Sequence, residues 1–335
     1  MRSRSRSRST DAPVHRISGP SELLAAVPYL LGFHPTDSLV LVGMRERRVV
    51  VTARLDLADT EQHGALEHAI GAMARGGAGS VIAVAYPSTG SVPDWAGLAR
   101  RLILIAGECR CGLADALLVR DGRWWSLVCT DDCCPPEGRP IEPGTSAFEA
   151  FATYEGMVVL PDRAAVEEQL TPYPDEERAR LDPLVEQEQR AAVRAVLRGE
   201  HQRRERSVKR GLFAVARASL APRWQPPNDA EVVRFGVALA AIPFRDSTWL
   251  AVDAGRLDGR PLWLELARRL PSPLELAPLL LFGWSAWRAG EAAVAGMAAD
   301  RALSVDPAYT AADLLMAAVT SGMNPHVMPR LRRSA

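Results

Sequence analysis

A histidine, two carboxylates, a hydroxyl and an arginine fall on or beside two consecutive predicted strands. His34, Asp37 and Ser38 stand where an apolar run begins, and Arg54 and Asp56 share one face of the next strand because side chains alternate. An imidazole can act as acid or base near neutral pH, and a carboxylate can orient it or bind a ligand. These five residues form the candidate ligand site. The alternative, which we favour, is a structural turn before the first strand and an internal ion pair on the second.

Cysteine thiols offer a second chemistry between residues 109 and 134. Cys129, Cys133 and Cys134 follow a predicted hairpin, and Cys109 and Cys111 precede it. Zinc sites usually combine paired Cys-x-x-Cys loops, and neither spacing here matches, so we predict no metal site. Cys129, Cys133 and Cys134 are candidates for redox chemistry, as a labile disulfide or a sensitive thiol, with metal binding as the weaker interpretation. For Cys109 and Cys111 we favour buried, inert thiols.

Motifs of the common catalytic mechanisms are missing from the chain. It lacks the Gly-x-x-x-x-Gly-Lys-Ser/Thr phosphate loop, the Gly-x-Ser-x-Gly nucleophile turn and the His-Glu-x-x-His zinc helix. The glycine-rich stretch Gly76–Gly79 follows a predicted helix and precedes a strand, whereas dinucleotide sites need the reverse order. We therefore assign no catalytic residue and no cofactor, and we favour a protein that is not an enzyme.

Charge is balanced over the whole chain but not along it. Forty basic and forty acidic residues cancel, so no overall field draws the protein towards nucleic acid or an anionic membrane. Residues 1–17 are dominated by alternating arginine and serine, which predicts a disordered tail. Basic residues also recur at helical spacing from Arg190 to Arg210. Without interleaved aromatic residues we favour a solvated helix face there, and weak nucleic-acid binding by the tail or this helix is a further alternative.

Periodicity between residues 18 and 172 switches repeatedly between strand and helix. A continuous apolar run at Ser38–Met44 predicts a central strand, and alternation at Val49–Leu57 predicts a strand with one polar face. Strands are also predicted at Ser80–Tyr86, at Met157–Leu160 and on both sides of Asp121-Gly122, a strong hairpin signal. Helices are predicted at Leu66–Met73, Trp95–Ile105 and Arg163–Leu170. The pattern is typical of a mixed α/β layered sheet domain.

The strand pattern stops after a proline-rich, acidic linker at residues 171–177. Helices are then predicted at Leu181–Leu220, Ala230–Ile242, Leu262–Leu270, Pro278–Gly290, Ala292–Val305 and Thr310–Thr320. Gly283, Ala295, Ala302 and Pro307 match the tetratricopeptide template, in which small residues let two helices approach and the proline ends the second. Residues 173–335 are therefore predicted to form an all-α tetratricopeptide-like helical domain with a hairpin at Leu279–Ser304.

Nothing in the sequence predicts a membrane span. The basic start and the apolar run Leu23–Phe33 imitate a signal peptide, but Pro28 interrupts the run, and Ser18–Glu22 is typical of a helix start with a capping hydroxyl. The longest later apolar run, Leu274–Trp287, is shorter than the roughly 20 residues that span a bilayer. An odd number of cysteines argues against a secreted disulfide framework, so we expect a cytoplasmic protein.

Several segments together resemble a known family. They are Gly19–Val40, with its Pro-Tyr-Leu-Leu-Gly-Phe-His-Pro core, Ala53–Leu57, Asp121–Ser126, Cys133–Gly138, Leu262–Pro271 and Gly283–Trp287. On these residues the chain resembles the actinobacterial domain-of-unknown-function family 4192 over nearly everything beyond the tail, while Cys109 and Cys111 fall outside the pattern. The resemblance implies a mostly cytoplasmic family without an established activity, so it carries no catalytic role over to this chain.

We expect a non-enzymatic binding or adaptor protein, because helical hairpins stack into concave surfaces that suit a protein or peptide partner. The main alternative is a small-molecule enzyme or ligand sensor that uses His34, Asp37, Ser38, Arg54 and Asp56 at the edge of the sheet, where open α/β sheets bind ligands. The two differ in geometry: the alternative requires His34 and Asp37 to line a pocket together with Arg54.

Overall fold

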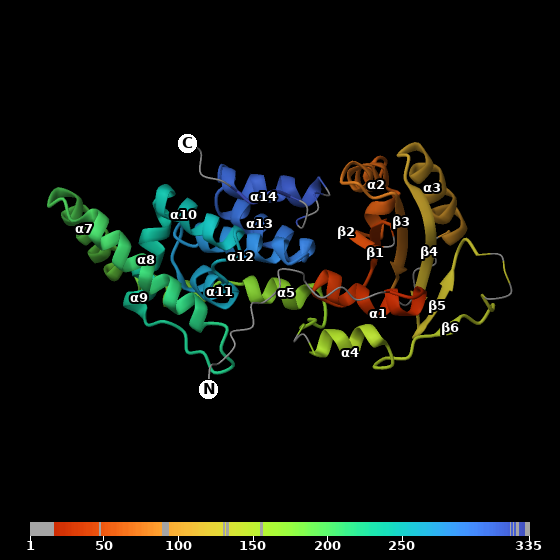
Figure 1. Ribbon diagram of the computed structural model, residues 1–335, viewed down its shortest axis with the longest axis horizontal. Coiled ribbons are helices and arrows are strands. Elements are labelled where there is room, and N and C mark those ends of the chain that lie inside the picture. Colours follow the sequence, from red (N-terminus) through yellow and green to blue (C-terminus); the bar gives the residue numbers. More distant parts are fainter. Residues whose placement is uncertain are drawn as a thin grey trace, which may run out of the picture.

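The computed structural model combines a sheet in the N-terminal half with helices in the C-terminal half (Figure 1). It describes residues 17–331 except 47, 89–93, 130, 132, 133, 155, 156, 322, 324, 326 and 327. Within these residues one mixed six-stranded sheet has the order β2-β1-β3-β4-β5-β6. The strands are β1 (Ser38–Arg45), β2 (Arg48–Asp56), β3 (Ser80–Tyr86), β4 (Gly112–Arg120), β5 (Arg123–Ser126) and β6 (Arg139–Pro140).

The first strands confirm the predictions from the hydrophobic pattern. The apolar run of β1 lies inside the sheet, paired antiparallel with β2 on one side and β3 on the other. The β3–β4 pair is parallel, and it is joined by a helix, as a parallel connection requires. At the tip of the β4–β5 hairpin, Asp121 and Gly122 both have positive φ, which the twist of a two-residue hairpin turn demands. β2 is left as an edge strand.

Helices cover both faces of the sheet. On one face lie α2 (Ala65–Arg75) and α3 (Trp95–Glu108), and on the other lies α1 (Pro20–Leu31), with α4 (Ala147–Tyr154) beside it and α5 (Arg163–Leu170) beyond (Figure 1). The predicted helix start at residues 18–22 is confirmed, but not its hydroxyl cap. Instead, the backbone N–H and the hydroxyl of Ser18 both donate to Glu22 Oε2, each at 2.6 Å.

In the described part of the C-terminal half, every regular element is a helix, as predicted. They are α6 (Asp175–Ala179), α7 (Asp182–Leu197), α8 (His201–Ala218), α9 (Asp229–Ala240), α10 (Ile242–Asp253), α11 (Arg260–Arg269), α12 (Leu276–Arg288), α13 (Ala292–Val305) and α14 (Thr310–Thr320). The α12–α13 hairpin lies at the predicted place, and α13 and α14 have the predicted bounds. The predicted helical run Leu181–Leu220 is two helices, because Gly199 takes a left-handed conformation and turns the chain.

The prediction of a strand at Met157–Leu160 is wrong. Leu160 forms an isolated parallel bridge with Phe33, beside the end of α1 and away from the six-stranded sheet. Met157 and Val158 are exposed, so the apolar run that suggested a buried strand is not buried. The predicted tail at residues 1–17 lies outside the described residues except for its last position. In the described part of the chain, no helix is long and apolar enough to cross a membrane.

The hydrophobic core runs through both halves of the molecule. The α2 and α3 side of the sheet packs as its own cluster around Leu41, Ile70 and Leu102. On the other side, Val40 and Val84 belong to a larger cluster that continues through α1 and α5 into the helices from α9 to α14. One face of the sheet and the helical half therefore share a single core, and α13 contacts both α1 and β2.

A wholly buried carboxylate holds the last described residues against the helical half. Asp253 at the end of α10 accepts hydrogen bonds from Trp284 Nε1 at 2.9 Å and from the Arg288 guanidinium at 2.6 Å. Its second oxygen accepts from the Leu331 N–H at 2.6 Å. Arg288 also donates to the Pro325 and Met328 carbonyls, so one ion pair holds three separate segments together.

Substituting Asp253→Asn tests this anchor. The change leaves the buried Arg288 guanidinium without its counter-charge, and we expect a loss of about 3–5 kcal/mol in the free energy of unfolding. The matched control is Asp246→Asn, which removes a half-exposed partner of Arg245 and should cost less than about 1 kcal/mol. Urea unfolding followed by tryptophan fluorescence measures both, and equal losses would contradict the assignment.

Candidate functional site

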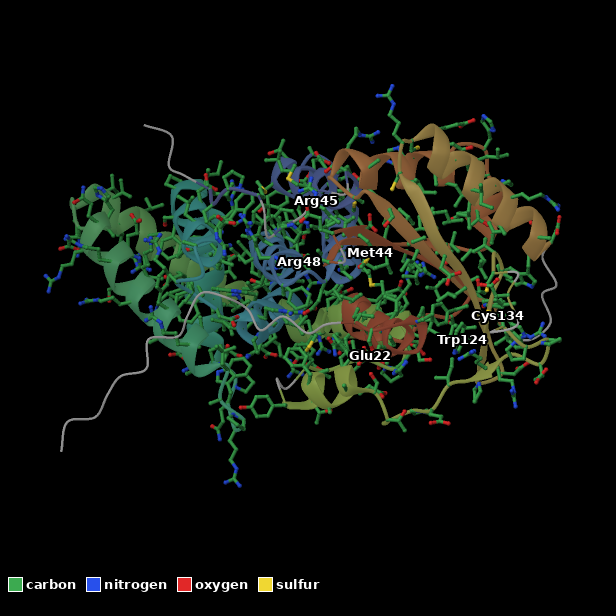
Figure 2. The ribbon with its side chains drawn as sticks, turned by 45° about the vertical axis from the view of Figure 1, so that its right-hand side comes forward. Glu22, Met44, Arg45, Arg48, Trp124 and Cys134 are labelled. Atoms are coloured by element: carbon green, nitrogen blue, oxygen red, sulfur yellow. The ribbon has the colours of Figure 1, made fainter. Side chains whose placement is uncertain are left out.

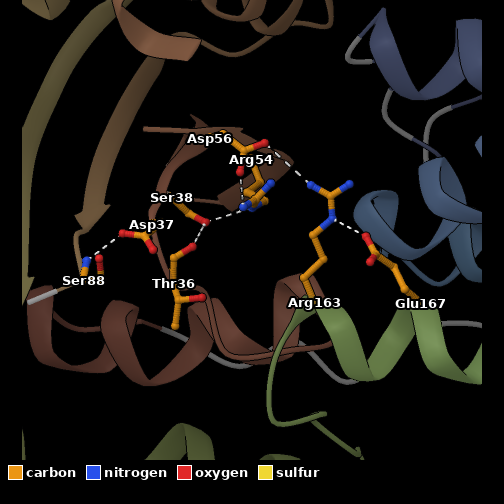
Figure 3. Close-up of polar contacts among 8 residues, drawn as sticks. All are labelled: Thr36, Asp37, Ser38, Arg54, Asp56, Ser88, Arg163 and Glu167. Carbon is orange, nitrogen blue, oxygen red and sulfur yellow. Dashed lines mark hydrogen bonds and ion pairs between the residues drawn. The ribbon is translucent and has the colours of Figure 1, made fainter. Parts of the chain in front are cut away.

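Three of the predicted site residues meet at one end of the sheet, on the face that α1 covers. Arg54 on β2 donates from Nε to Ser38 Oγ at 2.8 Å and from Nη2 to Asp56 Oδ1 at 2.6 Å (Figure 3). Ser38 is fully buried and its hydroxyl donates to the Thr36 carbonyl. The β1–β2 register places Ser38 opposite Asp56, which is why the alternating pattern of β2 brings these groups to the same face.

A residue that the sequence did not single out for a site completes this polar cluster. Arg163, in the first turn of α5, approaches Asp56 Oδ2 at 3.6 Å and donates from Nε to Glu167 at 2.9 Å (Figure 3). Asp56 therefore lies between two guanidinium groups, one from the sheet and one from the helix that leads into the C-terminal half. Arg54 and Arg163 are more than 100 residues apart in the sequence, so only the tertiary structure brings both to Asp56.

Asp37 and His34 are not part of this cluster. Asp37 has a positive φ, its carbonyl accepts from the Leu57 N–H, and its carboxylate accepts from the Ser88 N–H at 2.8 Å. Hydrogen bonds from the Ser88 side chain and backbone hold the pKa of Asp37 below its ordinary value. His34 is exposed, and its backbone N–H donates to the Leu160 carbonyl. The five candidate residues therefore divide into a polar cluster and a turn.

Tyr86 is a second polar group at this end of the sheet that the sequence did not single out. It pairs with Ser38 across β1 and β3, so the two side chains lie on one face. Its hydroxyl is buried without a hydrogen-bond partner among the described residues, and burial raises its pKa. Its position as the last residue of an apolar strand was the available signal, but that signal does not distinguish an orphaned hydroxyl from a satisfied one.

A cleft of about 450 Å³ opens beside this cluster, along the edge strand β2. Five consecutive β2 residues, 51–55, line it, so it is lined from both faces of that strand. One wall is α2, the other is α13 with the end of α14, and α1 and Arg163 line it as well. We call this space the β2 cleft.

Small and apolar side chains dominate the helical walls of the β2 cleft. The α2 wall presents Ala65, Ala69 and Ala72, and the α13 wall presents Ala292 and Gly296. The polar groups at its margin are those of Thr52, Arg54, His68, Arg163, Asp300 and Thr320. Burial raises the pKa of Asp300, while the nearby Arg163 charge opposes that shift. The formal charges of the two arginines are offset by Asp56, Glu167 and Asp300, so the surroundings do not select an anion.

β2 faces the cleft with the edge that β1 does not use. Its ladder is formed with β1 alone, and no backbone hydrogen bond from the outer edge to another described residue is found. All its residues from Val49 to Asp56 are half-buried. An unpaired strand edge carries a row of backbone donors and acceptors that can bind another extended chain.

The cysteines lie elsewhere. Cys129 and Cys134 both lie in the segment between β5 and β6, at the side of the sheet remote from β2, where Figure 2 labels Cys134. Cys133 lies outside the described residues. Cys109 and Cys111 are free thiols at the end of α3, and Cys111 is buried, which raises its pKa. Among the described residues, no group of three potential ligands is arranged to hold a metal ion.

A family model described as "Domain of unknown function (DUF4192)" matches residues 20–326 of the chain. No curated protein and no solved structure matches it.

The ion pairs around Asp56 predict two unequal substitutions. Arg54, with 11% of its side chain exposed, holds both Ser38 and Asp56, so Arg54→Met should cost about 2 kcal/mol of unfolding free energy. Arg163 is 41% exposed, and Arg163→Met should cost less than about 1 kcal/mol. Both are measured by urea denaturation. A loss at Arg163 as large as that at Arg54 would show that the cluster depends on α5 rather than on the strand pair.

Proposed function

The chain belongs to the DUF4192 family, a family of unknown function, and we propose that it is a non-enzymatic binding protein that holds an extended peptide segment of a partner protein along β2. The observation that carries the proposal is the free edge of β2 inside a cleft. A peptide added as a further strand would satisfy the outer backbone groups of β2, the mode of recognition known as β-augmentation.

The walls of the β2 cleft suit a peptide in this position. In an added strand, successive side chains would point alternately towards α2 and towards α13. Alanine or glycine residues of α2 and α13 line both walls, which leaves room for apolar side chains of the peptide. Backbone hydrogen bonds would supply affinity, and the two walls would supply the preference for apolar residues at alternate positions.

The helical half forms the α13 and α14 wall through close helix packing. A Cβ atom on Gly283 of α12 would lie 2.7 Å from Leu315 and 3.0 Å from Ala298, so glycine allows α12 to contact α13 and α14 closely. This packing supports a tetratricopeptide-like arrangement of the last three helices, which is part of the proposal. The proposal also includes a cytoplasmic location, which the odd number of cysteines favours.

A small-molecule ligand is the second candidate for the same cleft. Its volume lies within the range of small-molecule pockets, and Arg54 and Arg163 offer polar contacts at one end. His34 and Asp37 do not line the cleft, so the acid–base pair that the sequence suggested is not part of this candidate, and we propose it as a ligand sensor.

Filling the cleft from α13 tests the proposal. Gly296 lines the cleft, and a Cβ atom there would meet only Val319, at an ordinary contact distance of 3.7 Å. Gly296→Leu should therefore fold normally and occupy the space of the peptide. A library of short random peptides, displayed on phage and selected on the full-length protein, should yield binders with apolar residues at alternate positions, and Gly296→Leu should weaken their binding at least about tenfold, roughly 1.4 kcal/mol.

The matched control is Gly107→Leu, the same change on the exposed surface of α3, where a Cβ atom meets nothing within 4 Å. It should leave peptide binding unchanged. Selected peptides with helical spacing, or binding that survives Gly296→Leu, would contradict the proposal. So would selection of no peptide, an outcome that favours the small-molecule candidate.

A further inference from the structure

One face of α8 carries a row of arginines that form no salt bridge with a described acidic residue. Arg203, Arg206, Arg210 and Arg217 follow at spacings of three, four and seven residues, which place them on the same side of a helix. All four are exposed. The helix contains six basic side chains and one carboxylate, Glu205, which lies away from the centre of this row. We call the four arginines the α8 arginine row.

The charges of the α8 arginine row are not offset within the molecule. None of the four forms a salt bridge to another described residue. Glu200 precedes Arg203 by three positions, and the other residues three or four positions from the row are basic or neutral. Like charges at this spacing destabilise a helix by a few tenths of a kcal/mol per pair. Neighbouring arginines behave differently, since Arg190 pairs with Glu186 on α7 and Arg204 pairs with Glu188.

The fold holds this row in place. Val208, Leu212 and Ala216, on the opposite side of α8, are buried in the core. Lys209 extends from the margin of the row and donates to Ser247 of α10 at 2.7 Å. Together with Lys209 and Phe213, the row lines a shallow surface hollow of about 650 Å³ along α8. The helix lies with α7 and α9 at the end of the molecule opposite the sheet (Figure 1).

We infer that the α8 arginine row binds the phosphate backbone of duplex nucleic acid without regard to base sequence. Guanidinium groups bind phosphate oxygens in a two-pronged geometry. The row runs over 14 residues, or about 21 Å at 1.5 Å per residue. At about 3.4 Å per nucleotide, this length spans roughly six phosphates of one strand.

The neighbourhood of the row argues against other anionic partners. Phe213 is the aromatic residue within it, and Lys209 and Arg217 lie over its ring at 5.7 and 5.9 Å, so it offers no open platform for an unstacked base of a single strand. A membrane-binding helix needs bulky apolar residues on its exposed side, but the apolar stripe of α8 is already used in the core. A duplex backbone requires neither feature.

The test measures binding of the full-length protein to a fluorescent DNA duplex by anisotropy at several salt concentrations. The wild type should bind with an affinity that falls linearly with log salt, with a slope set by the number of phosphates contacted. Arg206→Ala/Arg210→Ala should weaken binding at least about tenfold at low salt and reduce the slope by about two. Alanine favours the helix, so this variant should stay folded.

The charge-matched control is Arg75→Ala/Arg100→Ala, which removes two exposed arginines from α2 and α3 at the other end of the molecule. It should bind the duplex as the wild type does. Because all variants retain the basic residues of the N-terminal segment, any contribution from that segment is common to them. Three results would overturn the inference. They are equal losses in both double variants, no duplex binding by the wild type, and an Arg206→Ala/Arg210→Ala variant that binds the duplex as the wild type does but no longer binds phosphatidylserine vesicles. Arg206→Ala/Arg210→Ala should leave peptide binding in the β2 cleft unchanged, so the experiments test the nucleic-acid proposal and the peptide proposal independently.

Discussion

The shared core between the sheet and the helices is the constraint on which the rest of the structure depends. The β1 and β3 residues that face α1, such as Val40 and Val84, pack in the same hydrophobic cluster as Leu279 and Ala295 of the helical half. Burial of apolar surface is the main favourable contribution to folding, so separating the halves would expose part of that core. Their relative position is therefore part of the fold rather than the property of a flexible linker.

The β2 cleft follows from this constraint. Because α13 is held by α12 and α14 and also contacts α1 and β2, it lies beside the edge strand. The space between α13 and α2 is lined largely by small side chains, and β2 retains unpaired backbone groups there. Ion pairs replace apolar packing at one end, where Asp56 lies between Arg54 and Arg163. The polar cluster thus fixes the end of β2 and α5, while the cleft beside it is left open.

The local elements could largely be predicted from the sequence. The apolar run of β1, the Asp-Gly turn and the periodicity of α13 and α14 each express short-range rules, and these elements lie where the patterns placed them. The prediction failed where a local pattern had more than one tertiary outcome. Met157–Leu160 has the composition of a strand but forms only the isolated bridge between Leu160 and Phe33, and α10 was not predicted because polar residues interrupt its apolar pattern.

The candidate site could be predicted only in part, because most of it is non-local. The meeting of Ser38, Arg54 and Asp56 follows from strand alternation and a hairpin register. Arg163, Gly296 and the wall of α14 come from distant parts of the chain, and nothing in a single sequence shows that they converge on β2. His34 and Asp37 were grouped with Ser38 because the three are close in sequence. The left-handed conformation of Asp37 turns the chain there, so that Ser38 faces Arg54 while His34 and Asp37 do not.

Amide hydrogen exchange of β2, with and without a selected peptide, tests the central claim most directly. If the outer edge of β2 is an unoccupied binding edge, amides directed outward within residues 51–55 should exchange much faster than those of β1 and β3 in the free protein. The peptide should slow them and leave the β3–β4 ladder unchanged. Outward amides of β2 that are as protected as those of β1 before the peptide is added, or that show no change after it, would contradict the account.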